Sequence, residues 1–291
     1  MDDFQQQINE WSDWQGLQLN AGAFEPVIQK IYASENEPYK TPEPVADKLA
    51  ARFTVGPTQI AIFPPSEVIP QTRAYYQAER FGLTRMARLS LGAPRLLHAG
   101  FIFDKYQFYY VIYQPLQGLT LTEFCATAKP LAKSTLGRQI GTMLTRLNTE
   151  VPAFGPTAAQ STEWDTLGPD FVAERTAWLQ VHTVAPNQFV HGNLVGGNLI
   201  VTSGELGLQR FSAAHQAAKQ TELVPLILQA FNDDTDLLAG FKETYQTDDL
   251  EKDLLLGLLL RVDGPQQIQA LHPGAPVTLA AVQQVIAQRL S

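Results

Sequence analysis

The first third of the chain alternates short apolar segments with turn residues, a pattern typical of β-strands. Residues 25–32, 48–55 and 59–63 are rich in β-branched and aromatic side chains and are bounded by Pro, Gly or Asn. Each of these segments is therefore predicted to form a strand. Residues 95–103 and the aromatic segment 107–113 are two further strand candidates. Together they predict a mostly antiparallel sheet in this part of the chain.

One helix is predicted between these strands and another one before them. Within residues 71–90, apolar side chains recur at steps of three and four residues, as on one face of an α-helix. These side chains are Tyr75, Ala78, Gly82, Leu83, Met86 and Leu89. Near the N-terminus, Phe4, Ile8, Trp11 and Trp14 indicate an amphipathic helix that packs on the same lobe.

After a break at Pro115 and Gly118, the pattern becomes mainly helical. Helical patterns cover residues 136–147, 168–182, 221–246, 249–262 and 278–290. Residues 198–201 and 206–209 are predicted to form a hairpin, because the Ser and Gly between them tolerate turn geometry.

These patterns predict an α+β fold with two lobes. We expect a small antiparallel β lobe with one helix over residues 1–114 and a larger, mainly helical lobe over residues 115–291. Hydrophobic residues make up 45% of the chain and charged residues 17%, values that argue against a disordered or coiled-coil protein.

Charge and cysteine content narrow the function further. The 21 Lys and Arg against 29 Asp and Glu give a net charge of −8, which argues against nucleic acid or an anionic membrane as a partner. The single cysteine, Cys125, cannot form an internal disulfide or a Cys-based zinc site. The polar, acidic N-terminus is unlike a signal peptide, so we expect a cytoplasmic protein.

The most informative segment runs from Phe189 to Val201 and reads Phe-Val-His-Gly-Asn-Leu-Val-Gly-Gly-Asn-Leu-Ile-Val. It resembles the catalytic loop of the small-molecule kinases with a protein-kinase-like fold: the aminoglycoside phosphotransferase, choline kinase and fructosamine kinase relatives. The resemblance implies that Asn193 stands at the place of the catalytic Asp. It also implies that Asn198 and Arg210 stand at the places of the two residues that hold magnesium beside the ATP phosphates.

Other segments resemble the same family and follow in the same order. They are residues 76–83, 94–100, 111–118, 136–148 and 151–155, the last of which is closest to the fructosamine kinase branch. The resemblance spans roughly residues 25–246. It implies that Glu79 corresponds to the partner of the ATP-binding lysine, and that Gln114 and Leu116 belong to the hinge that holds adenine.

The departures from the family pattern concern the residues that carry charge. An amide at Asn193 cannot act as a general base, a loss that commonly lowers the rate by about 10²–10⁴. A guanidinium at Arg210 has no lone pair for a metal ion. Phe63 stands in place of the lysine, since residues 59–63 contain none, and no Gly-rich phosphate loop precedes the second strand.

Glu79 is predicted to be buried and to pair with Arg210. It lies on the apolar face of the helix over residues 71–90, and a buried carboxylate needs a cation or several hydrogen-bond donors. With no lysine available, Arg210 is the nearest cation by analogy with the family. The predicted pair would place Arg210 in the space of the metal and the lysine.

Two functions remain open at this point. The first is a pseudokinase that binds a small ligand or a protein. The second is an active ATP-dependent kinase that phosphorylates a hydroxyl group of an amino sugar, a fructosamine or a choline-like compound by an atypical mechanism. ATP is left open as a ligand, and magnesium is not expected.

Overall fold

The computed structural model describes residues 3–157, 163–273 and 277–291, and the chain divides into two compact units. Unit 1 comprises Met1–Gln117, Phe154–Pro156 and Leu208–Ala213. Unit 2 comprises Gly118–Ala153, Thr157–Gly207 and Ala214–Ser291. In this division, two short segments of the second half of the chain, one of which contains Arg210, belong to unit 1, and the lobe boundary at 114/115 stays a prediction.

Unit 1 is built on one antiparallel sheet with the strand order β1-β2-β3-β5-β4. The strands are β1 (Glu43–Val45), β2 (Ala51–Val55), β3 (Thr58–Ile62), β4 (Arg95–Phe103) and β5 (Gln107–Gln114). Four of them confirm the predicted strands. The fifth, β1, was missed because it is three residues long and mostly exposed, so it has no apolar alternation.

The prediction of a strand over residues 25–32 is wrong, because this segment belongs to helix α2 (Ala21–Ser34). The buried residues of α2 are Phe24, Val27, Ile28, Ile31 and Tyr32. Their spacing of three and four residues is helical, although the side chains themselves are β-branched and aromatic. The Asn20 side chain accepts a hydrogen bond from the Ala23 N–H and caps the helix.

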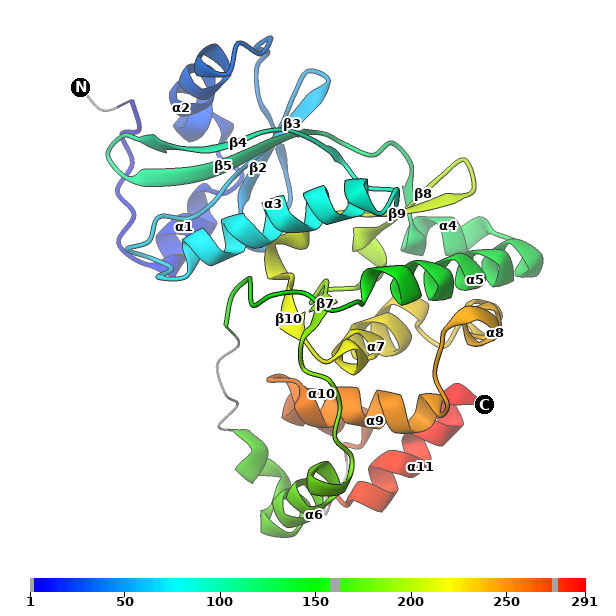
Figure 1. Cartoon of the computed structure of the whole chain (residues 1–291). Coiled ribbons are helices and arrows are strands. Elements are labelled where there is room, and N and C mark those ends of the chain that lie inside the picture. The colour runs from blue at the N-terminus through cyan, green and yellow to red at the C-terminus, as the bar shows by residue number, and fades with distance from the viewer. Residues whose placement is uncertain (1–2, 158–162, 274–276) are drawn as a thin grey trace. The chain divides into compact units, whose positions relative to one another are not determined.

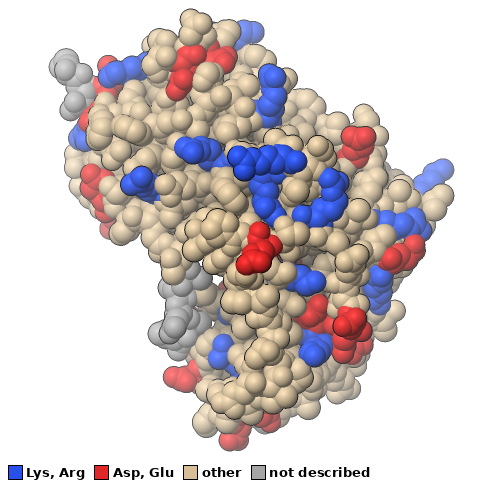
Figure 2. All heavy atoms as spheres, viewed as in Figure 1, with Lys and Arg blue, Asp and Glu red and all other residues tan. Residues whose placement is uncertain are grey.

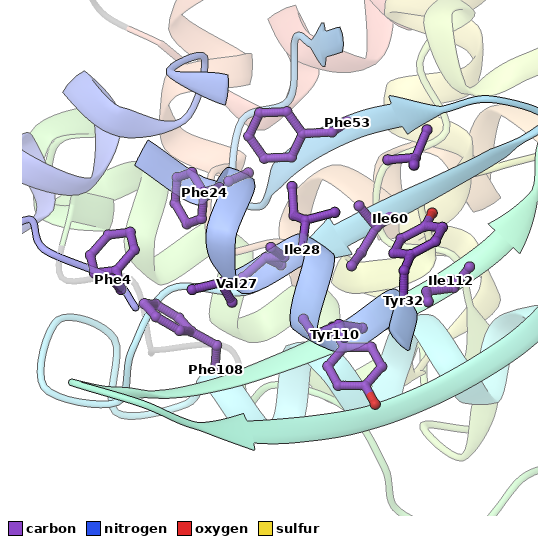
Figure 3. Close-up of a cluster of buried hydrophobic side chains, with 14 of the residues drawn as sticks. Phe4, Phe24, Val27, Ile28, Tyr32, Phe53, Ile60, Phe108, Tyr110 and Ile112 are labelled. Carbon is purple, nitrogen blue, oxygen red and sulfur yellow. The ribbon is translucent and has the colours of Figure 1, made fainter. Parts of the chain in front are cut away.

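Helix α2 covers one face of the sheet (Figure 1), and the short helix α1 (Trp11–Leu17) adds Trp14, which packs against Phe24 of α2 and Phe108 of β5. Side chains from both helices, from the strands and from the N-terminal segment form one core cluster in which Phe4, Phe24, Phe53 and Phe108 are fully buried (Figure 3). The predicted N-terminal helix is confirmed only over Trp11–Leu17, because Phe4 and Ile8 lie in the non-helical segment before it, and helix α2 was not predicted.

Helix α3 (Thr72–Arg88) lies on the opposite face of the sheet and confirms the predicted helix. Its single acidic residue, Glu79, is buried, whereas Arg73, Arg80 and Arg88 are exposed. Lys and Arg side chains accordingly gather over α3 on the surface (Figure 2). Glu79 therefore faces the sheet while the outer face of the helix is basic.

Unit 2 is mainly helical. Its helices are α4 (Leu121–Thr127), α5 (Pro130–Leu147), α6 (Pro169–Val181), α7 (Leu223–Pro225), α8 (Thr235–Thr244), α9 (Leu250–Leu260), α10 (Gly264–Leu271) and α11 (Leu279–Leu290), with a π-helical segment η5 (Leu226–Phe231). Two small sheets join β6 (Leu119–Thr120), β8 (Leu199–Thr202) and β9 (Glu205–Leu208), and β7 (Gln188–Val190) with β10 (His215–Ala217). The hairpin β8–β9 and the helices near residues 136, 168, 249 and 278 confirm their predictions.

The helix predicted over residues 221–246 is interrupted. Asn232 and Asp233 both have positive φ, at 47° and 64°, and separate η5 from α8. Helix α8 then packs closely on α5: a Cβ atom on Gly137 would lie 2.1 Å from the carbonyl oxygen of Leu237. Across the described ranges, no helix has both the length and the apolar character needed to cross a membrane.

Candidate functional site

Arg52 lies at the centre of a buried charged cluster in unit 1. It is on β2, is only 2% exposed, and is the cross-strand partner of Ala61 on β3. Cross-strand partners point to the same face of a sheet, so the small Ala61 side chain leaves room for the guanidinium. The Arg52 Nη1 atom donates to the Tyr113 hydroxyl, and its guanidinium lies 5.4 Å from the centre of that ring.

Asp47 in the β1–β2 loop accepts hydrogen bonds from several donors. Its Oδ1 atom accepts from the N–H groups of Leu49 (2.8 Å) and Ala50 (3.1 Å). Its Oδ2 atom lies 2.9 Å from Nε of Arg52 and 3.8 Å from Nε of Arg210. Burial alone would raise the pKa of Asp47, but Arg52, the Leu49 N–H and Arg210 together hold it below its usual value.

Glu79 is 1% exposed, which confirms its predicted burial, but its predicted ion pair with Arg210 is wrong. Its Oε1 atom lies 3.7 Å from Nη2 of Arg52, and no ion pair joins it to Arg210 in the part of the chain that the structure describes. Burial raises the pKa of Glu79, and Arg52 opposes that shift only in part. The cation that pairs with Glu79 is therefore Arg52 of β2, the strand beside β3, where the resemblance implies a lysine.

Arg210 is less buried than Arg52, with 30% of its side chain exposed. Its Nη2 atom donates to the carbonyl oxygen of Ala46 (3.0 Å). Its φ of +64° is in the left-handed region, which is uncommon for residues other than glycine. The next residue, Phe211, is fully buried against α3, where a Cβ atom on Gly82 would lie 2.4 Å from Phe211. Arg210 thus contacts the β1–β2 loop rather than α3.

The other expected site residues of unit 1 are Phe63, Gln114 and Leu116, and none of them is charged or takes part in the ion pairs described above. Phe63 is fully buried and packs edge-on against Tyr76 of α3, with ring centres 6.2 Å apart. Gln114 is the exposed last residue of β5, and Leu116 follows it half-buried. Their roles in place of a lysine and in an adenine hinge stay predictions.

In unit 2, the structure brings Asn193 and Asn198 together. Nδ2 of the buried Asn198 donates to the carbonyl oxygen of Asn193 (2.8 Å). The Asn193 N–H donates to Nδ1 of His191 (3.3 Å), and His191 is fully buried. These contacts fix the backbone of the segment that resembles a catalytic loop, and they use His191 as a structural acceptor.

Glu222 holds the backbone of the segment that resembles a catalytic loop, and the sequence analysis did not predict this role. Its two carboxylate oxygens accept from the N–H groups of His191 (2.8 Å) and Gly192 (2.8 Å). Burial raises the pKa of Glu222 to about 7, although these hydrogen bonds and the nearby Arg261 lower it. An acidic residue inside the apolar run 221–231 was the available signal.

The residues at the expected magnesium positions do not suit the metal. Magnesium takes oxygen ligands, chiefly carboxylates, together with water and phosphate. Asn198 offers one amide oxygen, and the guanidinium of Arg210 offers only donors. In the described ranges, no group of three or more His, Cys, Asp or Glu side chains is placed to hold a metal ion.

A separate hollow of about 460 Å³ lies in unit 2 beside α5 and β8. Apolar side chains of Phe124, Leu131, Leu136 and Val201 contribute most of its lining, with Lys129 among the polar residues. Its volume is in the range of small-molecule sites. None of the expected site residues lines it.

Comparison with known proteins shows the fold. No family model and no curated protein sequence matches the chain. Among solved structures, the chain is similar to an amicoumacin kinase in complex with AMP-PNP, Ca²⁺ and Ami (TM-score 0.59, 14% identity, 91% of each chain covered). It is equally similar to the GDP complex of aminoglycoside 2′-phosphotransferase-IIIa (TM-score 0.59, 14% identity, 93% of this chain and 98% of that one).

A choline kinase from Streptococcus pneumoniae is also similar, with a TM-score of 0.56, 14% identity, and 92% and 98% of the two chains covered. All three neighbours are small-molecule phosphotransferases with a kinase-like fold. The chain therefore has the protein-kinase-like fold that its sequence motifs predicted.

Proposed function

We propose that this chain is a pseudokinase: it has the fold of small-molecule phosphotransferases, binds a ligand or a protein partner, and does not transfer phosphate from ATP with magnesium. One observation carries the proposal. Arg210, at the place that the resemblance assigns to a magnesium-binding Asp, directs its guanidinium to Asp47 and the Ala46 carbonyl oxygen.

Phosphoryl transfer in this fold depends almost entirely on positioned charges that neutralise the phosphates. A guanidinium at the metal position repels a divalent cation, and the amide of Asn193 does not accept the proton of a hydroxyl substrate. Asp47 adds a negative charge to the loop between β1 and β2, the loop that covers the phosphates in the family that the sequence resembles. The cluster thus disfavours both the metal and the nucleotide phosphates.

The test combines ATP binding with product formation. Thermal unfolding of the full chain is measured with ATP, with and without magnesium. A ligand at a hundredfold excess over its Kd stabilises by about 2.7 kcal/mol, which a melting curve resolves. We expect no magnesium-dependent rise in the melting temperature and no phosphorylated product from amino sugars, fructosamines or choline.

The opposite result would establish the alternative, an active small-molecule kinase. It requires magnesium-dependent stabilisation by ATP and a phosphorylated product whose formation Asn193→Ala abolishes. Asn187→Ala is the matched control, because it removes a side-chain amide that donates to the Glu150 carboxylate (2.6 Å) and leaves the Asn193–Asn198 contact intact.

A further inference from the structure

The donors around Asp47 resemble those of an anion-binding site. Two successive loop N–H groups, from Leu49 and Ala50, point to one carboxylate oxygen, and the guanidinium groups of Arg52 and Arg210 lie at the other. Successive backbone N–H groups combined with arginine are the usual way in which proteins hold phosphate and related oxyanions. Here the anion is a side chain of the same loop.

The charges of the cluster explain why an anion is needed there. Arg52 and Arg210 are both close to Asp47, and each would raise the electrostatic energy of the other without it. Glu79 supplies one further negative charge, on the far side of Arg52, and burial disfavours its ionised form. Removal of the Asp47 carboxylate would leave an excess of positive charge and two unpaired N–H groups in a largely buried place.

We propose that Asp47 is an internal anion that occupies a site for a tetrahedral oxyanion, such as phosphate or a phosphate ester, and that this site becomes available when the Asp47 carboxylate is removed or displaced. The site consists of the Leu49 and Ala50 N–H groups and the Arg52 and Arg210 guanidinium groups. The inference deepens the proposed function, because it gives a reason why the phosphates of a nucleotide are not held, but the contacts that carry it are independent of catalysis.

The test is phosphate binding by variants of Asp47. Asp47→Asn removes the charge and leaves a neutral amide that phosphate can displace from the loop N–H groups. Asp47→Ser is the second variant, since its shorter side chain leaves room for phosphate while its hydroxyl can accept from the loop N–H groups when phosphate is absent. Thermal unfolding is followed in inorganic phosphate and in chloride at equal ionic strength. We expect both variants to melt below wild type in chloride and to gain about 2–3 °C at a tenfold excess of phosphate over its Kd, a gain that grows with the logarithm of the phosphate concentration.

Asp104→Asn is the matched control. The Asp104 carboxylate also accepts N–H bonds, from Asp3, Phe4 and Lys105, but the cation that it pairs with is Lys30, at 3.8 Å, and not an arginine. This variant should show only the small general stabilisation that phosphate gives to any folded protein, and it sets the baseline for the Asp47 variants. Adding Arg210→Ala to Asp47→Asn should weaken phosphate binding at least tenfold, because it removes one of the two guanidinium groups.

A second ligand, ADP, separates the two sources of the oxyanion. Binding of ADP no tighter than phosphate assigns the site to free oxyanions, and much tighter binding assigns it to nucleotides. The proposal is overturned if neither Asp47 variant gains stability from phosphate beyond the Asp104→Asn control, or if both stay unfolded in phosphate as in chloride. Phosphoryl transfer by wild type would refute the pseudokinase proposal, but it would not change whether the Asp47 variants bind phosphate.

Discussion

Replacement of Arg52 by Met is the most direct test of the charged cluster. The substitution keeps most of the buried volume and removes the only charge that lies near both Asp47 (2.9 Å) and Glu79 (3.7 Å) among the ion pairs of the described residues. Asp47 would then keep only the more distant Arg210, at 3.8 Å, and Glu79 would lose its ion-pair partner. The expected result is a large loss of stability.

The size of this loss follows from the geometry. Two unit charges about 4 Å apart interact by about 4 kcal/mol at an effective dielectric constant of 20. The cost of desolvating Arg52 itself offsets part of this, and measured losses on breaking buried pairs are about 3–5 kcal/mol. Arg210→Met removes a partly exposed pair and should cost about 1 kcal/mol or less. Arg88→Met, on the exposed face of α3, should change stability by less than about 0.5 kcal/mol.

The assay is urea unfolding followed by circular dichroism and tryptophan fluorescence. Trp14 is a suitable reporter, because it is fully buried in unit 1 and its indole donates to the carbonyl oxygen of Leu49 (2.8 Å). An unchanged m-value ensures that the midpoint reports stability. A loss below about 1 kcal/mol for Arg52→Met, or a larger loss for Arg210→Met, would refute the pairing described above.

Three further predictions concern other parts of the chain. The pKa of Glu222 is raised from 4.5 to about 7, so the folded chain holds a proton that the unfolded chain releases above pH 4.5. As the pH rises from 4.5 to 7, the free energy of unfolding of wild type should therefore fall by about 3 kcal/mol relative to that of Glu222→Gln. Urea unfolding across this range checks it, and a relative gain with rising pH would contradict it. Gly137→Ala should cost about 1–3 kcal/mol, since its Cβ would meet the Leu237 carbonyl oxygen, and an unchanged melting temperature would contradict that packing. Tyr106→Phe should cost about 1 kcal/mol and speed hydrogen exchange at Ile8, whose N–H donates to the Tyr106 hydroxyl; unchanged exchange at Ile8 would exclude the bond.

Much of the fold could be predicted from periodicity alone. The strands β2 to β5, helix α3 and the C-terminal helices each have several apolar positions at one clear period. Helix α2 was misread because its buried positions carry Val, Ile and Tyr, whose strand preference conflicts with their helical spacing. In that conflict the spacing was the better guide, since burial against the sheet stabilises the helix.

The candidate site was harder to predict. The burial of Glu79 followed from its place on the apolar face of α3, and the structure confirms it. Its partner did not follow, because an ion pair depends on which strands are adjacent and in what register, and neither is encoded locally. Arg52 is a charged residue inside the predicted strand 48–55, so the sequence shows its presence there. Only its pairing with Ala61 shows on which face of the sheet its guanidinium lies.

The position of Arg52 beside Ala61 has an evolutionary consequence. A lysine introduced at Ala61 would meet a guanidinium that already contacts Asp47 and Glu79, so a third cation would enter a cluster with two carboxylates. Substitutions at touching residues are not additive, so a lysine at Ala61 is unfavourable until Arg52 has changed. The order in which these two positions change therefore decides whether each replacement is tolerated.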